Sequence, residues 1–389
     1  QLLDVPVSEV PQLMAQQTIL INGNRQLTQL LDETIFCGSN IDIKANKIFI
    51  NIIDLTKNET ITNNPKMNPY LNLLSFVQVN NSLAKLNSTF IEASKLAVQY
   101  NANNYKISIE CQGQVNNVVI SLNHADDERN NAFINSTKKL NPIPIVNYPE
   151  VQKNEGTVNL PVNKPNKPRT ILYRVLGGEG IYNIDRVGCS TGFWVRFRTL
   201  ELLVTVGHCP GDTNQTDPDK LVYYHLPWGG TYDFRLIGSM IIRFLRPVDR
   251  GFIIRNSTRI SATPLIINQF GLEYRIAGTV LPDTEGAIVC KSGYTTEINC
   301  GTIFAIYGNL IHADETSHDH VIIVEGMECA SGDSGGPAFT VDEFTSTVYL
   351  VGMVFGGITE NGIKYCYVHP VSAILLEGME VITIDNTMI

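Results

Sequence analysis

The segment Gly332-Asp333-Ser334-Gly335-Gly336-Pro337 carries the most specific signal in this chain. Its glycines allow the backbone to turn sharply, and such a turn leaves the serine hydroxyl exposed beside backbone N–H groups. Those N–H groups are suited to bind an oxyanion. Because a serine hydroxyl is a poor nucleophile until a neighbouring base removes its proton, the segment predicts a histidine elsewhere in the chain.

The segment Thr205-Val206-Gly207-His208-Cys209 supplies this histidine. His208 follows the apolar run 202–206 and precedes a cysteine that can pin the loop, which is a sensible way to hold an imidazole in one orientation. A histidine alone is more often a structural residue. Its occurrence together with the serine segment favours a general base.

Length and composition place the chain among ordinary globular proteins. Its 389 residues favour two folded units, and 43% hydrophobic with 17% charged residues is a typical balance. The net charge of -9 disfavours attraction to polyphosphate, so we expect no nucleic-acid partner. No apolar run reaches the roughly 18 to 20 residues that cross a bilayer, so we expect no membrane insertion. The chain begins with Gln, and any secretory signal would lie outside this numbering.

The eight cysteines favour an oxidising compartment, and therefore secretion. Cys189 with Cys209, and Cys290 with Cys300, are close enough in sequence to bracket short segments suited to disulfides. No Cys/His spacing typical of zinc sites occurs, so we expect no metal. Glycosylation sequons suit a secreted glycoprotein but support it weakly, because they also arise by chance in a chain rich in Asn. They are Asn58, Asn80, Asn87, Asn135, Asn214 and Asn256.

The two halves of the chain differ in texture. Residues 1–145 mix helical and strand patterns, which predicts an α+β domain. The expected elements are a short helix at 27–31, a strand pair at 41–53, a helix at 82–100 and two strands at 105–122. Residues 146–174 form a proline-rich linker, which we expect to be exposed and open to proteolysis. From Val175 onward, short β-branched and aromatic runs predict an all-β barrel or sandwich.

The stretch 175–389 resembles the streptogrisin and α-lytic protease branch of the trypsin-like serine peptidases. The matching pieces stand in family order: Val175-Leu176-Gly177-Gly178, Gly188-Cys189-Ser190-Thr191-Gly192-Phe193, Gly207-His208-Cys209, Cys290-Lys291-Ser292-Gly293-Tyr294-Thr295-Thr296, Cys300-Gly301-Thr302 and the Ser334 segment. This resemblance implies a mainly β fold of two six-stranded antiparallel β-barrels (chymotrypsin-like), with peptide bonds as substrate and no cofactor.

The resemblance also assigns catalytic roles. Ser334 would attack the peptide carbonyl, His208 would take and return the proton, and the backbone N–H groups of Gly332 and Ser334 would form the oxyanion hole. The third triad member follows an Ile-Gly-Thr strand in the family, which points here to Asp249 in Val248-Asp249-Arg250-Gly251. Asp233 is the rival.

Lys291 occupies the position at which this branch places an internal arginine. The resemblance implies that its ammonium pairs with Asp333 and forms the oxyanion hole without a liberated N-terminus. The alternative is a solvated surface lysine.

The pocket for the residue before the scissile bond would be lined by two segments. These contain Met327 and Glu328, and Phe355, Gly356 and Gly357. Glu328 would favour a basic residue if its carboxylate faced the pocket, but it can equally point to solvent. Phe355 stands where the family usually has serine, which removes a hydroxyl near Asp249 and narrows the cleft.

The resemblance implies a third disulfide between Cys329 and Cys366, although Cys366 is displaced from the usual position. The histidines that suggest a metal site are interpreted as a solvated loop instead. They are His312, His318 and His320, with Asp319 between the last two.

The first half resembles, more weakly, a streptogrisin-type propeptide in Phe36-Cys37-Gly38-Ser39-Asn40-Ile41-Asp42 and Asn46-Lys47-Ile48-Phe49-Ile50-Asn51. This implies that the propeptide assists folding, inhibits the peptidase until cut near Arg174-Val175, and holds a bond between Cys37 and Cys111. The overall prediction is a secreted serine endopeptidase made as a zymogen. The alternative is a catalytically weak, protease-like binding or structural protein.

Overall fold

The computed structural model describes residues 6–102, 105–111, 115–122, 128–148, 151–152, 172–186, 188–211, 218–230, 232–269, 272–311, 317–342 and 345–386. The chain divides into two compact units. The first comprises Gln1–Val151, Pro282–Ala287 and Thr302–Ile323; the second comprises Gln152–Leu281, Ile288–Gly301 and Val324–Ile389. No described helix is long and apolar enough to cross a membrane.

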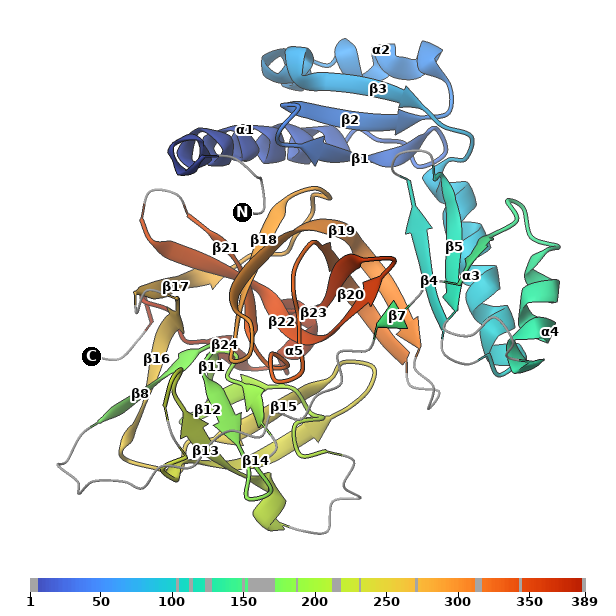
Figure 1. Ribbon diagram of the computed structural model, residues 1–389. Coiled ribbons are helices and arrows are strands. Elements are labelled where there is room, and N and C mark those ends of the chain that lie inside the picture. Colours follow the sequence, from blue (N-terminus) through green and yellow to red (C-terminus); the bar gives the residue numbers. More distant parts are fainter. Residues whose placement is uncertain are drawn as a thin grey trace. The chain divides into compact units, whose positions relative to one another are not determined.

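The first unit begins with a helix packed on a small sheet, drawn in blue in Figure 1. The strand β2 pairs antiparallel with β1 and parallel with β3. In β2 the alternating side chains Ile48, Ile50 and Ile52 are fully buried, as expected for a strand with one face on the core. The elements here are η1 (Val7–Glu9), α1 (Val10–Thr28), β1 (Phe36–Asp42), β2 (Lys47–Ile52), η2 (Leu55–Asn58), α2 (Glu59–Thr62), η3 (Pro65–Leu73) and β3 (Leu74–Gln78).

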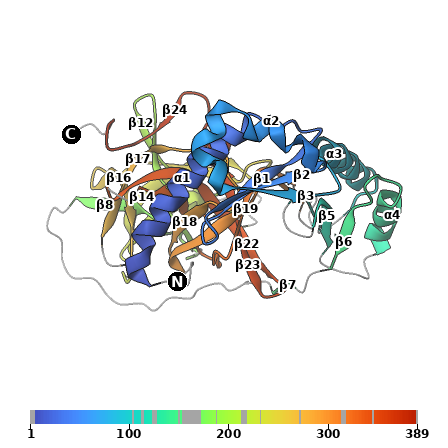
Figure 2. The ribbon, with the colours of Figure 1, turned by 90° about the horizontal axis from the view of Figure 1, so that it is seen from above.

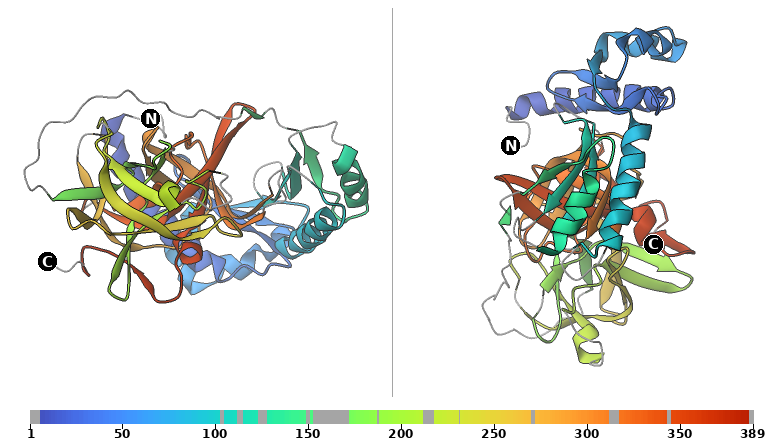
Figure 3. Two further views of the ribbon diagram at one scale, coloured as in Figure 1. Left: turned by 90° about the horizontal axis from the view of Figure 1, so that it is seen from below. Right: turned by 90° about the vertical axis from the view of Figure 1, so that its right-hand side faces the viewer.

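A second sheet of this unit carries two helices on one face, which lie side by side in Figures 2 and 3. It consists of β4 (Tyr105–Glu110), β5 (Asn117–Leu122) and β6 (Ile145–Asn147), covered by α3 (Leu83–Gln99) and α4 (Glu128–Thr137). The Ser82 hydroxyl accepts from Lys85 N and caps α3. The last residues of β19 (Glu297–Ile311) pair antiparallel with β4, which extends this sheet.

The second unit contains a closed, six-stranded antiparallel barrel, mainly green and yellow in Figure 1. Pairing runs from β9 through β13, β14, β15 and β12 to β11, and β10, which precedes β11 in the chain, pairs back to β9. Phe193, Trp194 and Phe252 lie in its buried core. Five of the six positions are filled by β9 (Gly180–Tyr182), β12 (Leu200–Thr205), β13 (Val222–Leu226), β14 (Arg235–Phe244) and β15 (Arg250–Ile254). The sixth is shared by β10 (Gly188–Ser190) and β11 (Trp194–Phe197), which follow one another in the chain.

The remaining strands of this unit include a second antiparallel run in the order β18, β21, β22 and β23. β8 (Tyr173–Gly177) joins β16 in parallel. The other elements of this unit are η4 (Pro218–Leu221), β16 (Ile260–Ile267), β17 (Glu273–Thr279), β18 (Ile288–Gly293), β21 (Pro337–Val341), β22 (Thr347–Glu360), β23 (Ile363–Pro370), α5 (Val371–Ile374) and β24 (Met379–Val381). The remaining strand, β20 (Ser317–Glu325), has most of its residues in the first unit. The all-β texture expected from Val175 onward is confirmed.

Several local expectations change. The helix expected at 27–31 is wrong, because α1 covers Val10–Thr28 and ends there. The strand pair expected at 41–53 begins earlier, at Phe36. The linker 146–174 carries short strands at both ends, β7 (Val151–Gln152) and β8 among them, and most of the linker lies outside the described residues.

Candidate active site

His208 and Asp249 meet in the barrel of the second unit. His208 follows β12 and Asp249 precedes β15, and these two strands pair directly. The Nδ1 atom of His208 lies 2.5 Å from Oδ2 of Asp249. The other carboxylate oxygen, Oδ1, accepts from the backbone N–H groups of Gly207 at 2.6 Å and His208 at 3.1 Å. The carboxylate is therefore fixed at both oxygens and orients the imidazole.

The rival carboxylate, Asp233, lies elsewhere in the barrel. It forms an ion pair with Arg235 at the start of β14. Asp249, and not Asp233, is the carboxylate that the structure brings to His208.

Ser334 lies in a tight turn just before β21. Gly332 and Gly335 have φ values of 95° and 94°, in the region that favours glycine. A Cβ on Gly335 would lie 2.2 Å from Thr205 Oγ1 and 2.3 Å from Ser190 O, so only glycine fits there. The Ser334 hydroxyl donates to the carbonyl of Phe355 at 3.4 Å. Among the described residues, the N–H groups of Gly332 and Ser334 donate to no backbone carbonyl.

A short chain of contacts holds this turn against the loop of His208. Ser190 N donates to the carbonyl of Ser334 at 2.7 Å, and Ser190 Oγ donates to the carbonyl of Gly332 at 2.7 Å. The preceding residue, Cys189, is bonded to Cys209, the neighbour of His208. The serine turn and the histidine loop are thus anchored to the same strand, β10.

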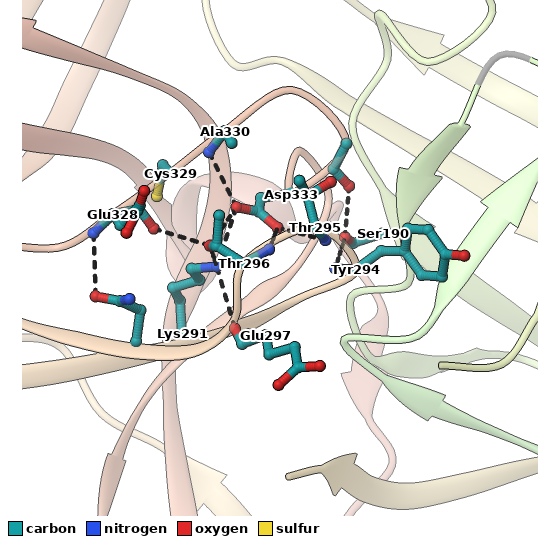
Figure 4. A network of polar contacts seen from close by, with 12 residues as sticks. Ser190, Lys291, Tyr294, Thr295, Thr296, Glu297, Glu328, Cys329, Ala330 and Asp333 are labelled. Carbon is teal, nitrogen blue, oxygen red and sulfur yellow. Dashed lines mark hydrogen bonds and ion pairs between the residues drawn. The ribbon is translucent and has the colours of Figure 1, made fainter. Parts of the chain in front are cut away.

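Lys291 and Asp333 form an ion pair with no exposed side-chain surface, in the network of Figure 4. Lys291 Nζ lies 3.1 Å from Asp333 Oδ2 and donates to the carbonyl of Glu297 at 3.1 Å and to the hydroxyl of Thr296. Its complete burial excludes the solvated surface lysine that the sequence left open.

Both oxygens of the Asp333 carboxylate accept hydrogen bonds. Oδ1 accepts from the backbone N–H groups of Thr295 and Thr296, and Oδ2 accepts from Ala330 N and Thr296 Oγ1, all within 3.0 Å. A buried charge needs such compensation. Burial lowers the pKa of Lys291 from its ordinary value of 10.5, against the opposing effect of Asp333.

The expected pocket residues occupy two neighbouring stretches. Met327 is fully buried, and Phe355, Gly356 and Gly357 lie in β22. A Cβ on Gly357 would lie 2.8 Å from Cβ of Cys329, so the backbone passes close to the disulfide. The Glu328 carboxylate lies 2.8 Å from Lys364 Nζ, and both side chains are more than two-fifths exposed. Glu328 is therefore a surface residue with its own cation.

The structure joins the eight cysteines in four disulfides, the pairs that the sequence and the resemblance suggested. They are Cys37–Cys111, Cys189–Cys209, Cys290–Cys300 and Cys329–Cys366. The predicted cut, Arg174-Val175, lies within β8, where Val175 is fully buried and Arg174 pairs with Glu273.

The histidine-rich stretch differs from expectation. His318 lies in β20 and is 6% exposed, so it is not in a solvated loop; His312 lies outside the described residues. In the part of the chain that the structure describes, no three His, Cys, Asp or Glu residues gather in a way that suits a metal.

Sequence reasoning missed two buried histidines. His225 Nε2 lies 2.8 Å from Glu179 Oε2. His369 accepts from the backbone N–H of Asp249 at 3.1 Å. Neither histidine lies in a recognisable catalytic motif, because each contacts a residue that is distant in the sequence.

With these features, the C-terminal part of the chain is similar to serine proteases of the streptogrisin and α-lytic protease branch. No family model matches the chain. Streptogrisin-C of Streptomyces griseus is 26% identical over 218 residues, which cover 54% of this chain. The match spans only 41% of that relative.

Two solved structures are similar to the same part of the chain. Thermobifida fusca protease A and Cellulomonas bogoriensis chymotrypsin are each 24% identical, and each aligns over its full length with 54% of this chain. Their TM-scores are 0.43 and 0.42. The N-terminal part left unmatched is consistent with a propeptide.

Proposed function

We propose that this chain is a secreted serine endopeptidase, made as a zymogen. The observation that supports this most is the pair of His208 Nδ1 and Asp249 Oδ2, 2.5 Å apart, anchored to the same strand as the Ser334 turn. Orientation of an imidazole by a buried carboxylate is what converts a serine hydroxyl into a nucleophile. Four disulfides support an oxidising compartment.

In the proposed reaction, Ser334 Oγ attacks the peptide carbonyl while His208 Nε2 takes its proton. The N–H groups of Gly332 and Ser334 stabilise the oxyanion, and the imidazolium, stabilised by Asp249, returns the proton to the leaving amine. A water then repeats the sequence on the acyl-enzyme and restores the Ser334 hydroxyl. The Lys291–Asp333 pair holds the turn that carries these N–H groups.

We propose residues 1–145 as an inhibitory propeptide, 146–174 as the segment that is cut, and 175–389 as the peptidase, with β19 and β20 completing a second six-stranded barrel around β18, β21, β22 and β23. Cleavage at Arg174-Val175 requires β8 to leave β16, because a protease binds an extended, unpaired backbone. The substrates are proteins or peptides, and no cofactor takes part.

Labelling with a fluorophosphonate probe tests the activity. After removal of the N-terminal region, the wild-type chain should be labelled at Ser334, and the Ser334→Ala variant should not be labelled. Labelled protein should also hydrolyse peptide substrates in proportion to the labelled fraction. Absence of Ser334-dependent labelling in the processed, folded chain would favour the alternative, a protease-like binding or structural protein.

A further inference from the structure

His369 is a fully buried histidine outside the three residues assigned to the chemistry. It lies in β23, opposite Met353 of β22. A Cβ on Gly352 would lie 2.0 Å from the His369 carbonyl, so the two strands pack too closely for a larger residue at that position. The backbone that carries this imidazole is therefore held firmly.

The imidazole of His369 contacts both Asp249 and Phe355. Its Nε2 atom accepts the backbone N–H of Asp249 at 3.1 Å. Its ring stacks on Phe355, with centroids 4.0 Å apart and planes 16° apart. An Nε2 that accepts a hydrogen bond carries no proton, so the contact requires the neutral tautomer with its proton on Nδ1.

Phe355 connects this histidine to the nucleophile. Its carbonyl accepts from the Ser334 hydroxyl at 3.4 Å, while its ring covers His369. One unbroken set of contacts thus runs from Ser334 through Phe355 and His369 to the backbone of Asp249. The side chain of Asp249 meets His208 at the other end.

Asp249 is held at more than one atom. Its Oδ1 accepts from the backbone N–H groups of Gly207 and His208. Its own backbone N–H donates to His369, so the acceptor on His369 restricts the backbone that carries the carboxylate.

We infer that His369, with Phe355 stacked on its ring, is a positioning residue for the Asp249–His208 pair. This inference rests on the proposed peptidase function. His369 does not touch the substrate; it fixes the distance between the carboxylate and the imidazole that must receive the Ser334 proton. Loss of its acceptor atom then slows the chemical step and leaves substrate binding nearly unchanged.

Two substitutions at His369 distinguish the role of its Nε2 acceptor from the role of its aromatic ring. His369→Phe keeps an aromatic ring for stacking but leaves the buried Asp249 N–H without an acceptor, whereas His369→Gln supplies a side-chain carbonyl. Val381→Ala, in β24 of the same unit, is a control for general loss of stability. The kcat, KM, fluorophosphonate labelling rate and melting temperature of each processed chain are measured.

The expected result is a fall of about tenfold or more in kcat and labelling rate for His369→Phe, with KM changed by less than about threefold. His369→Gln should recover a clear part of the loss, and Val381→Ala should keep the wild-type kcat despite a lower melting temperature. If His369→Phe does not fold, His369→Leu removes the acceptor without the ring and is expected to show the same fall.

This inference is overturned if His369→Gln loses as much kcat as the variants without an acceptor. It is also overturned if the variants without an acceptor keep the same kcat as Val381→Ala. In both cases the proposed function stands. A wild-type chain that is not labelled at Ser334 overturns the proposed function and this inference with it.

Discussion

At the scale of single residues, the serine turn depends on a charge that is completely removed from water. Asp333 accepts from three backbone N–H groups and one hydroxyl, and Lys291 supplies the opposite charge. Because the same turn carries the N–H groups of Gly332 and Ser334, its geometry is coupled to the protonation of Lys291.

We predict an alkaline loss of turnover set by Lys291. Because burial lowers its pKa, Lys291 loses its proton below pH 10.5, and the ion pair with Asp333 is lost as pH rises through that lowered pKa. In Lys291→Arg the guanidinium keeps its charge to higher pH than the buried ammonium does, so the alkaline fall in kcat/KM should move to higher pH. Turnover of both chains from pH 7 to 10.5 measures this shift.

The free energy of unfolding shows whether the alkaline loss of turnover comes from unfolding or from the site. Between the lowered pKa and 10.5, the unfolded chain holds more protons at this residue than the folded chain, so the contribution of Lys291 to the free energy of unfolding rises with pH. Lys291→Met, which leaves Asp333 buried without a cation, should lose about 3–5 kcal/mol. Identical alkaline profiles for wild type and Lys291→Arg would contradict the assignment.

At the scale of elements, the disulfide Cys189–Cys209 joins β10 to the loop after β12. It closes 20 residues of chain, and it lies beside both His208 and the residue that holds the Ser334 carbonyl. The disulfide Cys290–Cys300 closes only 10 residues, between β18 and β19. Because the two disulfides close loops of comparable length, we expect them to stabilise the folded chain by similar amounts. Their positions predict different effects on the site.

We predict that the double variant Cys189→Ser/Cys209→Ser loses roughly 3 kcal/mol of unfolding free energy and also most of its labelling at Ser334. Cys290→Ser/Cys300→Ser is the matched control, with a similar loss of stability and a smaller loss of labelling per folded molecule. Urea unfolding and fluorophosphonate labelling of the folded fraction distinguish the two. A larger loss of labelling in the control would contradict the role given to the Cys189–Cys209 bond.

The elements also show what the sequence can predict. The helix α3 has apolar residues at helical spacing and a serine cap, so its pattern alone marked it out at 82–100. The helix α1 was missed because its buried residues include Gln17, Gly23 and Asn24. Asn24 bonds to Thr284 Oγ1, 260 residues further along the chain, and no local pattern contains such a partner.

The same contrast holds for the site. Ser334 and His208 lie in short motifs whose glycines and cysteine indicate a constrained loop. Asp249 was selected only by its place in a family pattern, and the geometry of its carboxylate separates it from Asp233. The support from His369 was not predictable, because it depends on how β23 packs beside the loop of Asp249.

At the scale of the whole molecule, the C-terminal half depends on pairings between distant segments. β12 pairs with β15, and β9 pairs with β13, so each closure joins residues far apart in the chain. The compact first unit also includes two segments of that half, Pro282–Ala287 and Thr302–Ile323. Asp283 pairs with Arg25 at 2.8 Å, and the end of β19 pairs with β4. Part of the C-terminal half thus completes its structure with N-terminal residues.

We therefore predict that residues 172–389 alone refold slowly and in low yield, because nonlocal strand pairing is slow and the segments that pair with the N-terminal region lack their partners. Addition of a separate fragment of residues 1–152 should raise the refolded yield by about tenfold or more, measured by titration of Ser334 with a fluorophosphonate probe. An unrelated protein at the same concentration is the control for nonspecific protection from aggregation. A fragment Arg25→Ala should help less, because it lacks the partner of Asp283. Equal yields with and without the fragment would show that residues 172–389 fold independently, and the first half would then have a role other than assisting folding.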